Sequence, residues 1–230
     1  MWFLDGILSG YIIIVLIIPS TTMQLTWLGH ASFKILGAGK VIYIDPYAGN
    51  YDEKADIILV THDHFDHFVS EKIIGISSDS TIIFSTSSVA SHLNTVIALS
   101  PGDKKDAEGI IIEAVQAYNT NKRFHPKGLG IGFVISVEGK KIYHAGDTDR
   151  IPEMKYIKCD VALLPVSGTY VMNAKEAVEA LKDIKPKFAI PMHFGAIAGT
   201  IDDAELFKEL SEKETGIEVK ILKEGEKIVI

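Results

Sequence analysis

One heptapeptide, residues 61–67 (THDHFDH), constrains this chain more than any other segment. It follows the apolar run 56–60, which predicts a short buried strand, so the cluster lies where a strand gives way to a loop. Neutral imidazole and carboxylate are ligands for zinc and similar ions. His62 and His64 point the same way in extended chain, whereas Asp66 and His67 leave in another direction as the backbone turns. This one cluster could therefore serve two neighbouring metal ions.

Composition limits the class of protein. With 230 residues, 47% of them hydrophobic, the chain can build a sizeable core in one large domain or two small ones. Its net charge of −7 argues against nucleic acid as a partner, because phosphate backbones are held by clustered lysine and arginine. The single cysteine, Cys159, cannot form an intrachain disulfide and is expected to be a packing residue. We therefore expect a cytoplasmic protein.

The first residues form a separate segment. Residues 7–18 are strongly apolar and stop at Pro19, but a spanning helix wants roughly 20 apolar residues. No positive n-region of a signal peptide precedes them, since the only early charge is Asp5. We expect residues 1–22 to be an upstream extension or an over-called start, and residues 23–230 to form a single domain. A membrane anchor through residues 7–18 is the alternative, with membrane contact through residues 1–22.

The rest of the chain alternates short strands with helices. We expect helices at 68–76, 87–94, 173–184 and 202–214. Alternation and β-branched residues predict strands at 23–28, 32–36, 40–44, 57–60, 81–85, 96–99, 109–117, 131–137, 141–144, 161–164, 188–192, 218–222 and 227–230. Strand meanders, each followed by strand–helix alternation, indicate two similar halves whose sheets face each other with helices outside. Strand-end loops of both halves would then meet along one edge.

Further histidines follow later strands. His144 and Asp147 come directly after one strand and His193 after another, while His125 lies in a polar loop. A lone histidine at such a position is usually an ordinary surface or hydrogen-bonded residue. Three of them downstream of a dense His/Asp cluster favour a shared site.

With these residues, the chain resembles the metallo-β-lactamase fold hydrolases over residues 23–230. The family motif His-x-His-x-Asp-His stands here as His62, His64, Asp66 and His67. Residues 26–32 (TWLGHAS), 144–148 (HAGDT) and 190–193 (IPMH) look like the branch of uncharacterised metal-dependent hydrolases related to L-ascorbate-6-phosphate lactonase.

The resemblance implies an α/β fold, namely an αββα four-layer sandwich of two facing mixed sheets with outer helices. It also implies a site for two divalent ions, most simply Zn²⁺, with Mn²⁺ or Fe²⁺ as alternatives. By motif order, a first ion would be held by His62, His64 and His125. A second would be held by Asp66, His67 and His193, with Asp147 bridging. His144 competes with His125 for the place in the first group.

Two divalent ions about 3.5–4 Å apart can share a hydroxide that is nucleophilic at neutral pH. The charge of two divalent ions exceeds that of two aspartates and one hydroxide, so such a centre has a net positive charge. This charge favours an anionic substrate or transition state. Asp66 could orient the hydroxide and accept its proton. We therefore expect a hydrolase in which a metal-bridging hydroxide opens an ester, lactone or phosphoester bond of a small anionic substrate. The alternative is a phosphodiesterase acting on nucleic acid or phospholipid.

Supporting roles are expected for residues around this set. Asp45 could hold a ligating imidazole in the correct tautomer, the alternative being a simple turn carboxylate. His30 and His144 could supply a proton to the leaving group. Substrate phosphate or carboxylate could be bound by the basic residues beside His125, which are otherwise solvated loop charges: Lys122, Arg123 and Lys127. A homo-oligomer is expected, although no residue pattern derives it.

Overall fold

The structure is a computed structural model that describes residues 22–230. The expected N-terminal extension, residues 1–22, therefore lies outside the described residues except for Thr22. Among the helices of residues 22–230, none has the length and apolar character needed to cross a lipid bilayer.

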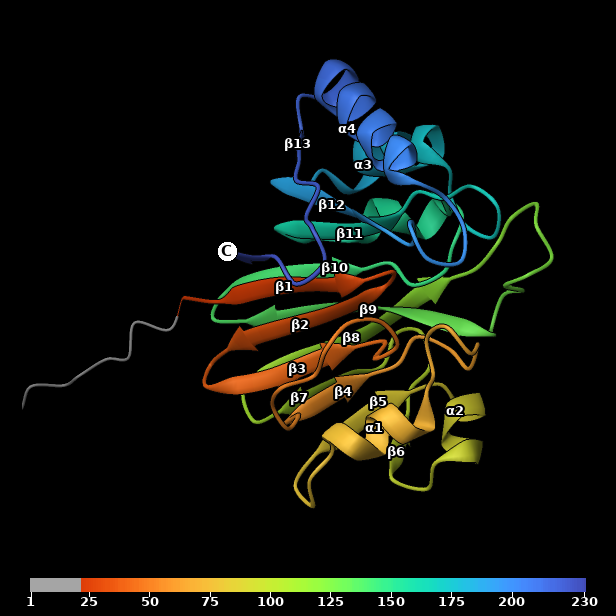
Figure 1. The fold of residues 1–230 in the computed structure, drawn as a ribbon. Helices are drawn as coiled ribbons and strands as arrows, with labels where there is room; N and C mark the ends of the chain where they lie inside the picture. Colours follow the sequence, from red (N-terminus) through yellow and green to blue (C-terminus); the bar gives the residue numbers. More distant parts are fainter. Residues whose placement is uncertain (1–21) are drawn as a thin grey trace, which may run out of the picture.

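The first sheet has seven strands in the order β14-β1-β2-β3-β4-β5-β6 (Figure 1). Strands β1 to β3 form an antiparallel meander, and β3 to β6 run parallel. The last strand of the chain returns to this sheet and pairs antiparallel with β1. Its strands are β1 (Gln24–Gly29), β2 (Ser32–Gly37), β3 (Lys40–Ile44), β4 (Ile57–Leu59), β5 (Ile82–Ser85), β6 (Val96–Ala98) and β14 (Lys227–Val229).

The second sheet repeats this plan in the order β13-β12-β11-β10-β9-β8-β7. Strands β7 to β10 are antiparallel, and β10 to β13 run parallel. Its strands are β7 (Lys104–Ala107), β8 (Ile110–Ala117), β9 (Gly130–Val137), β10 (Lys140–His144), β11 (Val161–Pro165), β12 (Phe188–Met192) and β13 (Glu218–Val219).

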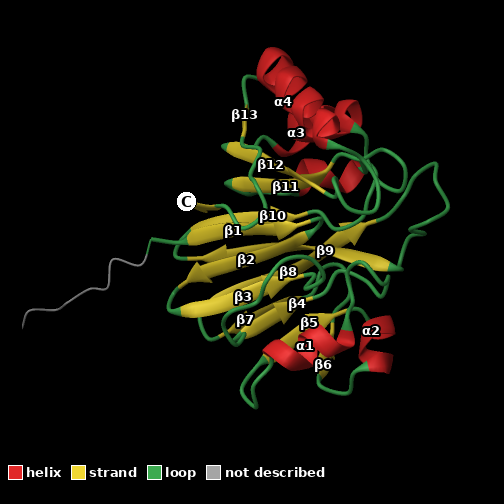
Figure 2. Cartoon of the chain, in the orientation of Figure 1, coloured by secondary structure: helices red, strands yellow, loops and turns green. Residues whose placement is uncertain are grey.

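The helices cover the outer faces, α1 and α2 on the first sheet and α3 and α4 on the second (Figure 2). Helix α3 begins with a reciprocal capping box between Asn173 and Glu176, and α4 begins with one between Thr200 and Asp203. The helices are α1 (Ser70–Ile76), α2 (Ser87–His92), α3 (Ala174–Ile184) and α4 (Ile201–Thr215), with a short 3₁₀ helix at Pro152–Tyr156.

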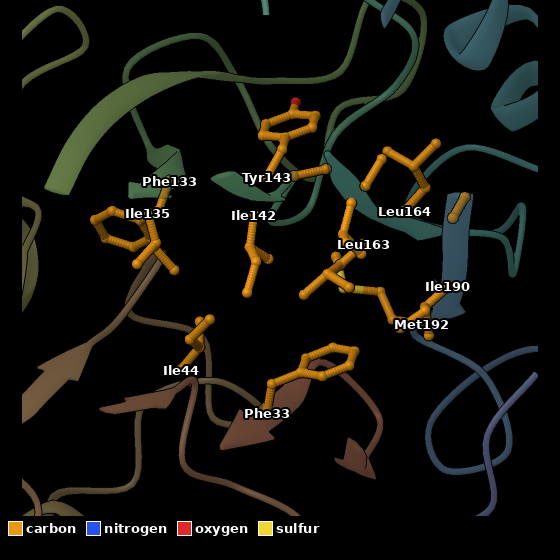
Figure 3. Packing of buried hydrophobic residues seen from close by; sticks show 14 of the residues in the cluster. Phe33, Ile44, Phe133, Ile135, Ile142, Tyr143, Leu163, Leu164, Ile190 and Met192 are labelled. Atoms are coloured by element: carbon orange, nitrogen blue, oxygen red, sulfur yellow. The ribbon is translucent and has the colours of Figure 1, made fainter. Parts of the chain in front are cut away.

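Alternation along the strands produces the layers. On β4, Ile57 and Leu59 pack in the core between the sheets, whereas Ile58 packs in the cluster under α1 and α2. Figure 3 shows the same alternation on β10, where Ile142 points toward the first sheet and Tyr143 points away from it. The predicted αββα sandwich, two mixed sheets with outer helices, is confirmed.

Two elements depart from the predictions. Strand β7 was not predicted, because Lys104, Lys105 and Asp106 are charged and exposed. Charged residues are tolerated there because β7 lies at the edge of its sheet. The 3₁₀ helix at Pro152–Tyr156 was not predicted either.

Candidate metal centre

The two sheets are joined where their strand-end loops meet. The backbone N–H of His193, directly after β12, donates to the carbonyl of His30, directly after β1, at 2.9 Å. The N–H of Ile131 on β9 donates to the carbonyl of Thr61 at 3.0 Å. His30 and His193 both have a positive φ, of 51° and 61°, which non-glycine residues seldom adopt. The loops that carry the histidines are thereby fixed relative to one another.

Asp45 anchors the heptapeptide from the neighbouring strand. Its carboxylate is fully buried, and it accepts hydrogen bonds from the Thr61 N–H at 2.7 Å and the Thr61 hydroxyl at 2.7 Å. It also accepts one from Nδ1 of His67 at 2.8 Å. With Nδ1 donating, the lone pair of His67 Nε2 is free to face the site. The proposed tautomer-fixing contact of Asp45 is thus present in the fold.

The same arrangement recurs at three more histidines. Because the Thr61 hydroxyl donates to Asp45, its oxygen accepts from His62 Nδ1, at 2.9 Å. His193 Nδ1 lies 3.0 Å from the Ser167 hydroxyl. His125 Nδ1 lies 3.2 Å from Asn119 Oδ1 and 3.2 Å from the Tyr170 carbonyl. Each histidine therefore has Nδ1 bound to the protein and Nε2 available as a metal ligand.

The available ligand atoms form a first group of three histidines. His62, His64 and His125 have ligand atoms within 4.8 Å of one another. His125 Nε2 lies 3.2 Å from His64 Nδ1. His125 comes from the loop between β8 and β9, which extends at the right of Figure 1. The structure thus brings His125 to the heptapeptide.

A second group contains Asp66, His67 and His193, together with His30. His30 Nε2 lies 3.1 Å from Asp66 Oδ2, in hydrogen-bonding geometry. The same carboxylate oxygen lies 3.9 Å from His67 Nε2. Three of these four residues were expected to hold the second ion, and His30 is the addition.

Asp147, from the loop after β10, lies between the two groups. Its Oδ2 is 3.3 Å from Nε2 of His125 and 3.0 Å from Nε2 of His193. Its Oδ1 is 3.3 Å from Nε2 of His67. One buried carboxylate thus touches histidines of both groups, which is the position that a bridging ligand requires.

Buried ligand atoms without hydrogen bonds test whether divalent metal fits here. Buried polar atoms in folded proteins nearly always have a partner, because an unpaired one costs free energy. Within residues 22–230, five atoms of this cluster are buried and have none. Four belong to the expected ligands, namely Nε2 of His62, His67 and His193 and Oδ1 of Asp147, and the fifth is Nδ1 of His30. Imidazole nitrogens and a carboxylate oxygen that converge in this way fit divalent ions.

The pKa values of the buried groups reflect a balance between burial and the charges of their neighbours. Burial alone would raise the pKa of Asp147, but the nearby His193 and His67 outweigh it and hold that pKa well below its usual value. Burial alone would lower the pKa of His67, yet Asp147 and Asp45 raise it well above its usual value. Burial, together with His67, keeps the pKa of His62 well below its usual value.

His144 is placed differently from the other candidates. Its Nε2 donates to the Ala31 carbonyl at 2.9 Å, and its Nδ1 accepts from the Gly146 N–H at 3.2 Å. Both ring nitrogens are thus used by the backbone, and the ring is completely buried. Burial lowers the pKa of His144. The structure does not bring this residue to the ligand groups; it links the β1–β2 loop to the second sheet.

Two of the three basic residues beside His125 pair with carboxylates outside the ligand groups. Lys122 Nζ lies 2.6 Å from the buried carboxylate of Asp149, and Lys127 Nζ lies 3.0 Å from Glu153. Arg123 is exposed. None of the three lines the pocket over the metal groups.

That pocket has a volume of about 450 Å³ and opens over both groups. Asp66, Asp147, His64, His125 and His193 contribute to its walls. Its remaining lining residues come from the surrounding loops: Asp63, Phe65, Phe124, Tyr170 and Ile197.

Sequence reasoning missed the residues that hold the histidines in place. Asn119, Ser167 and the Tyr170 carbonyl fix His125 or His193 through Nδ1. Ser167 follows β11, the parallel neighbour of β12, so its position beside His193 could have been predicted from adjacent strand ends. Asn119 and Tyr170 lie in irregular loops and gave no such signal.

Comparison with known proteins agrees with this geometry. A family model described as a beta-lactamase superfamily domain matches residues 24–193. A UPF0173 metal-dependent hydrolase from Archaeoglobus fulgidus is 36% identical over 226 residues, which cover 89% of this chain and 97% of that protein. Another, from Methanopyrus kandleri, is 33% identical and covers 89% of this chain and 98% of its own.

Solved structures give the same result. A protein from Parabacteroides distasonis matches with a TM-score of 0.81 and 33% identity, over 89% of this chain and 94% of that one. A metallo hydrolase from Ignicoccus hospitalis matches with a TM-score of 0.78 and 28% identity, over 91% of this chain and 99% of that one. The chain therefore belongs to the metallo-β-lactamase superfamily, as a metal-dependent hydrolase.

Proposed function

We propose that the chain is a dinuclear-metal hydrolase that cleaves an ester, lactone or phosphoester bond of a small anionic substrate. One observation carries the proposal. Four buried ligand atoms without hydrogen-bond partners among residues 22–230 converge below one pocket, in two groups that Asp147 connects.

The ligand sets follow from the two groups. His62, His64 and His125 would hold the first ion, and a second would be held by Asp66, His67 and His193, with Asp147 between the two. Imidazole and carboxylate ligands favour zinc, with manganese or iron as alternatives. Ions held by these residues would supply a hydroxide as the nucleophile and would polarise the oxygen of the scissile group.

Residues of the chain position that chemistry. Asp66 lines the pocket and is the acceptor we assign to the proton of the nucleophile. His30 lies behind it, with Nε2 3.1 Å from Asp66 Oδ2, so we assign His30 the role of orienting this carboxylate rather than of protonating a leaving group directly. His144 takes no part, because both of its ring nitrogens are hydrogen-bonded to the backbone.

The alternative, a phosphodiesterase on nucleic acid or phospholipid, ranks second. Long phosphate chains are held by several lysine and arginine side chains. Among the described residues, the pocket lining includes neither. This composition supports a small substrate that contacts the centre itself.

The test combines elemental analysis with a screen of lactones, thioesters, esters and phosphodiesters. Wild-type protein should bind two divalent ions per chain. The variant His64→Ala should lose metal, and its kcat/KM should fall at least about a hundredfold because a ligand of the first group is gone. His92→Ala, an exposed histidine on α2, is the matched control and should change neither value. Full metal content in His64→Ala would contradict the proposal.

A further inference from the structure

We infer that the substrate outside its scissile group is an uncharged, apolar body, so that any negative charge lies on the scissile group itself, as it does in a phosphoester. This inference rests on the proposed function, because it takes the metal groups as the place where the scissile bond lies. It is carried by the side chains around the mouth of the pocket. We name four of them the apolar rim: Phe65, Phe124, Tyr170 and Ile197.

The apolar rim is assembled from four separate loops. Phe65 comes from the heptapeptide and Phe124 from the β8–β9 loop, while Tyr170 and Ile197 follow β11 and β12. The Phe124 and Tyr170 rings meet edge to face, with centroids 4.7 Å apart and planes at 89°. Four loops from both sheets thus present apolar surface around one metal centre.

The rim side chains remain open to solvent. Phe65 is 68% exposed, Phe124 46% and Ile197 39%. Covering exposed apolar surface with an apolar ligand lowers the free energy of the system. Ligand pockets are typically apolar, with a few polar groups that fix the orientation of the ligand. Here the polar groups are the metal ligands, which lie in the same pocket. An apolar body against the rim would leave the scissile group at the metals.

The charges around the pocket disfavour a second negative group on the substrate. The nearby cations Lys122 and Lys127 are paired with Asp149 and Glu153, and neither lines the pocket. Asp63 does line it and belongs to none of the ligand groups in residues 22–230. Its carboxylate accepts a hydrogen bond from the Ser88 hydroxyl, which leaves its negative charge in place. Among the described residues, the pocket lining contains no lysine or arginine, so a carboxylate or phosphate on the substrate body would face Asp63 with no cation of the lining to compensate it.

A matched pair of inhibitors tests this directly. A hydroxamate binds a metal ion through its two oxygens, so benzohydroxamate and 4-carboxybenzohydroxamate present the same head and differ only in the charge of the body. Each is titrated by calorimetry into the zinc-loaded full chain. We expect benzohydroxamate to bind at least about tenfold more tightly, since the added carboxylate meets the apolar rim and Asp63.

Variants locate the effect. Phe124→Ala should weaken benzohydroxamate binding about fivefold by removing rim surface. Tyr156→Ala is the matched control, because Tyr156 is an aromatic residue that is 73% exposed and lies outside the pocket. Asp63→Asn should narrow the difference between the two hydroxamates while zinc content stays constant. Zinc content is measured for every variant, so that loss of metal is not mistaken for loss of the rim.

The outcomes separate the inference from the proposed function. Equal or tighter binding of 4-carboxybenzohydroxamate would overturn the apolar-body inference and leave the hydrolase proposal standing. An unchanged Kd of benzohydroxamate in Phe124→Ala would also overturn it. If neither hydroxamate binds the zinc-loaded chain, the metal centre is not open to ligands, and the proposed function and this inference both fail.

Discussion

At the scale of single residues, the centre depends on the groups that hold Nδ1 of four histidines: His62, His67, His125 and His193. Asp45 is the clearest example, because one buried carboxylate accepts from the Thr61 backbone, the Thr61 hydroxyl and His67. Removing the charge of Asp45 while keeping its shape would replace the carboxylate that accepts from His67 Nδ1 by a weaker, neutral acceptor. Partners of this kind typically contribute tenfold to a hundredfold to metal affinity.

Asp45→Asn should therefore weaken zinc affinity about tenfold without unfolding the protein. The measurement is competition with a chelator of known affinity. Asp103→Asn is the control, since Asp103 is an exposed carboxylate whose contact is with the Ser100 backbone N–H in a turn. Identical zinc affinities for the two variants would show that Asp45 is only a turn residue.

At the scale of elements, the loop after β10 places Asp147 by close backbone packing. Gly146 adopts a φ of +65°, and a Cβ there would lie 2.9 Å from the Ile131 carbonyl oxygen and 3.3 Å from Thr61 Cβ. The loop can therefore approach β9 and the heptapeptide only with glycine at this position. This contact sets where the carboxylate of Asp147 lies between the two groups.

Gly146→Ala should destabilise the protein by about 3 kcal/mol and reduce zinc binding, because the loop must move away from Ile131. Gly139→Ala is a matched control. Gly139 has a similar φ of +76°, but nothing lies within 4 Å of an added Cβ. We expect it to cost about 1 kcal/mol with no effect on zinc. Urea denaturation measures the free energy of unfolding and zinc titration the zinc affinity. Equal effects of the two variants on these quantities would refute the packing argument.

At the scale of the whole molecule, the sequence predicted what local patterns determine. The alternation of apolar residues predicted most strands, and the heptapeptide with its downstream histidines predicted which strand ends would meet. The sequence could not decide whether His125 or His144 completes the first ligand group, because that depends on how an irregular loop folds over the other sheet. Nor could it foresee that Lys122 would turn to Asp149, a contact between residues 27 positions apart. The expectation that Lys122, Arg123 and Lys127 bind a substrate anion depended on the fold of the same loop, which the sequence does not reveal.

The centre is built from both halves of the molecule, so neither half can hold it alone. The heptapeptide supplies four of the proposed ligands, and the second half supplies His125, Asp147 and His193. Hydrogen bonds such as that from His193 to the His30 carbonyl hold the two sets together. We therefore propose that two ions lie between the sheets with Asp147 shared by both.

Anomalous diffraction at the zinc edge, from crystals of the zinc-loaded protein, would locate these ions. We expect two anomalous peaks, one beside His62, His64 and His125 and the other beside Asp66, His67 and His193. Asp147 should contact both. A single peak, or a peak away from these residues, would contradict this proposal.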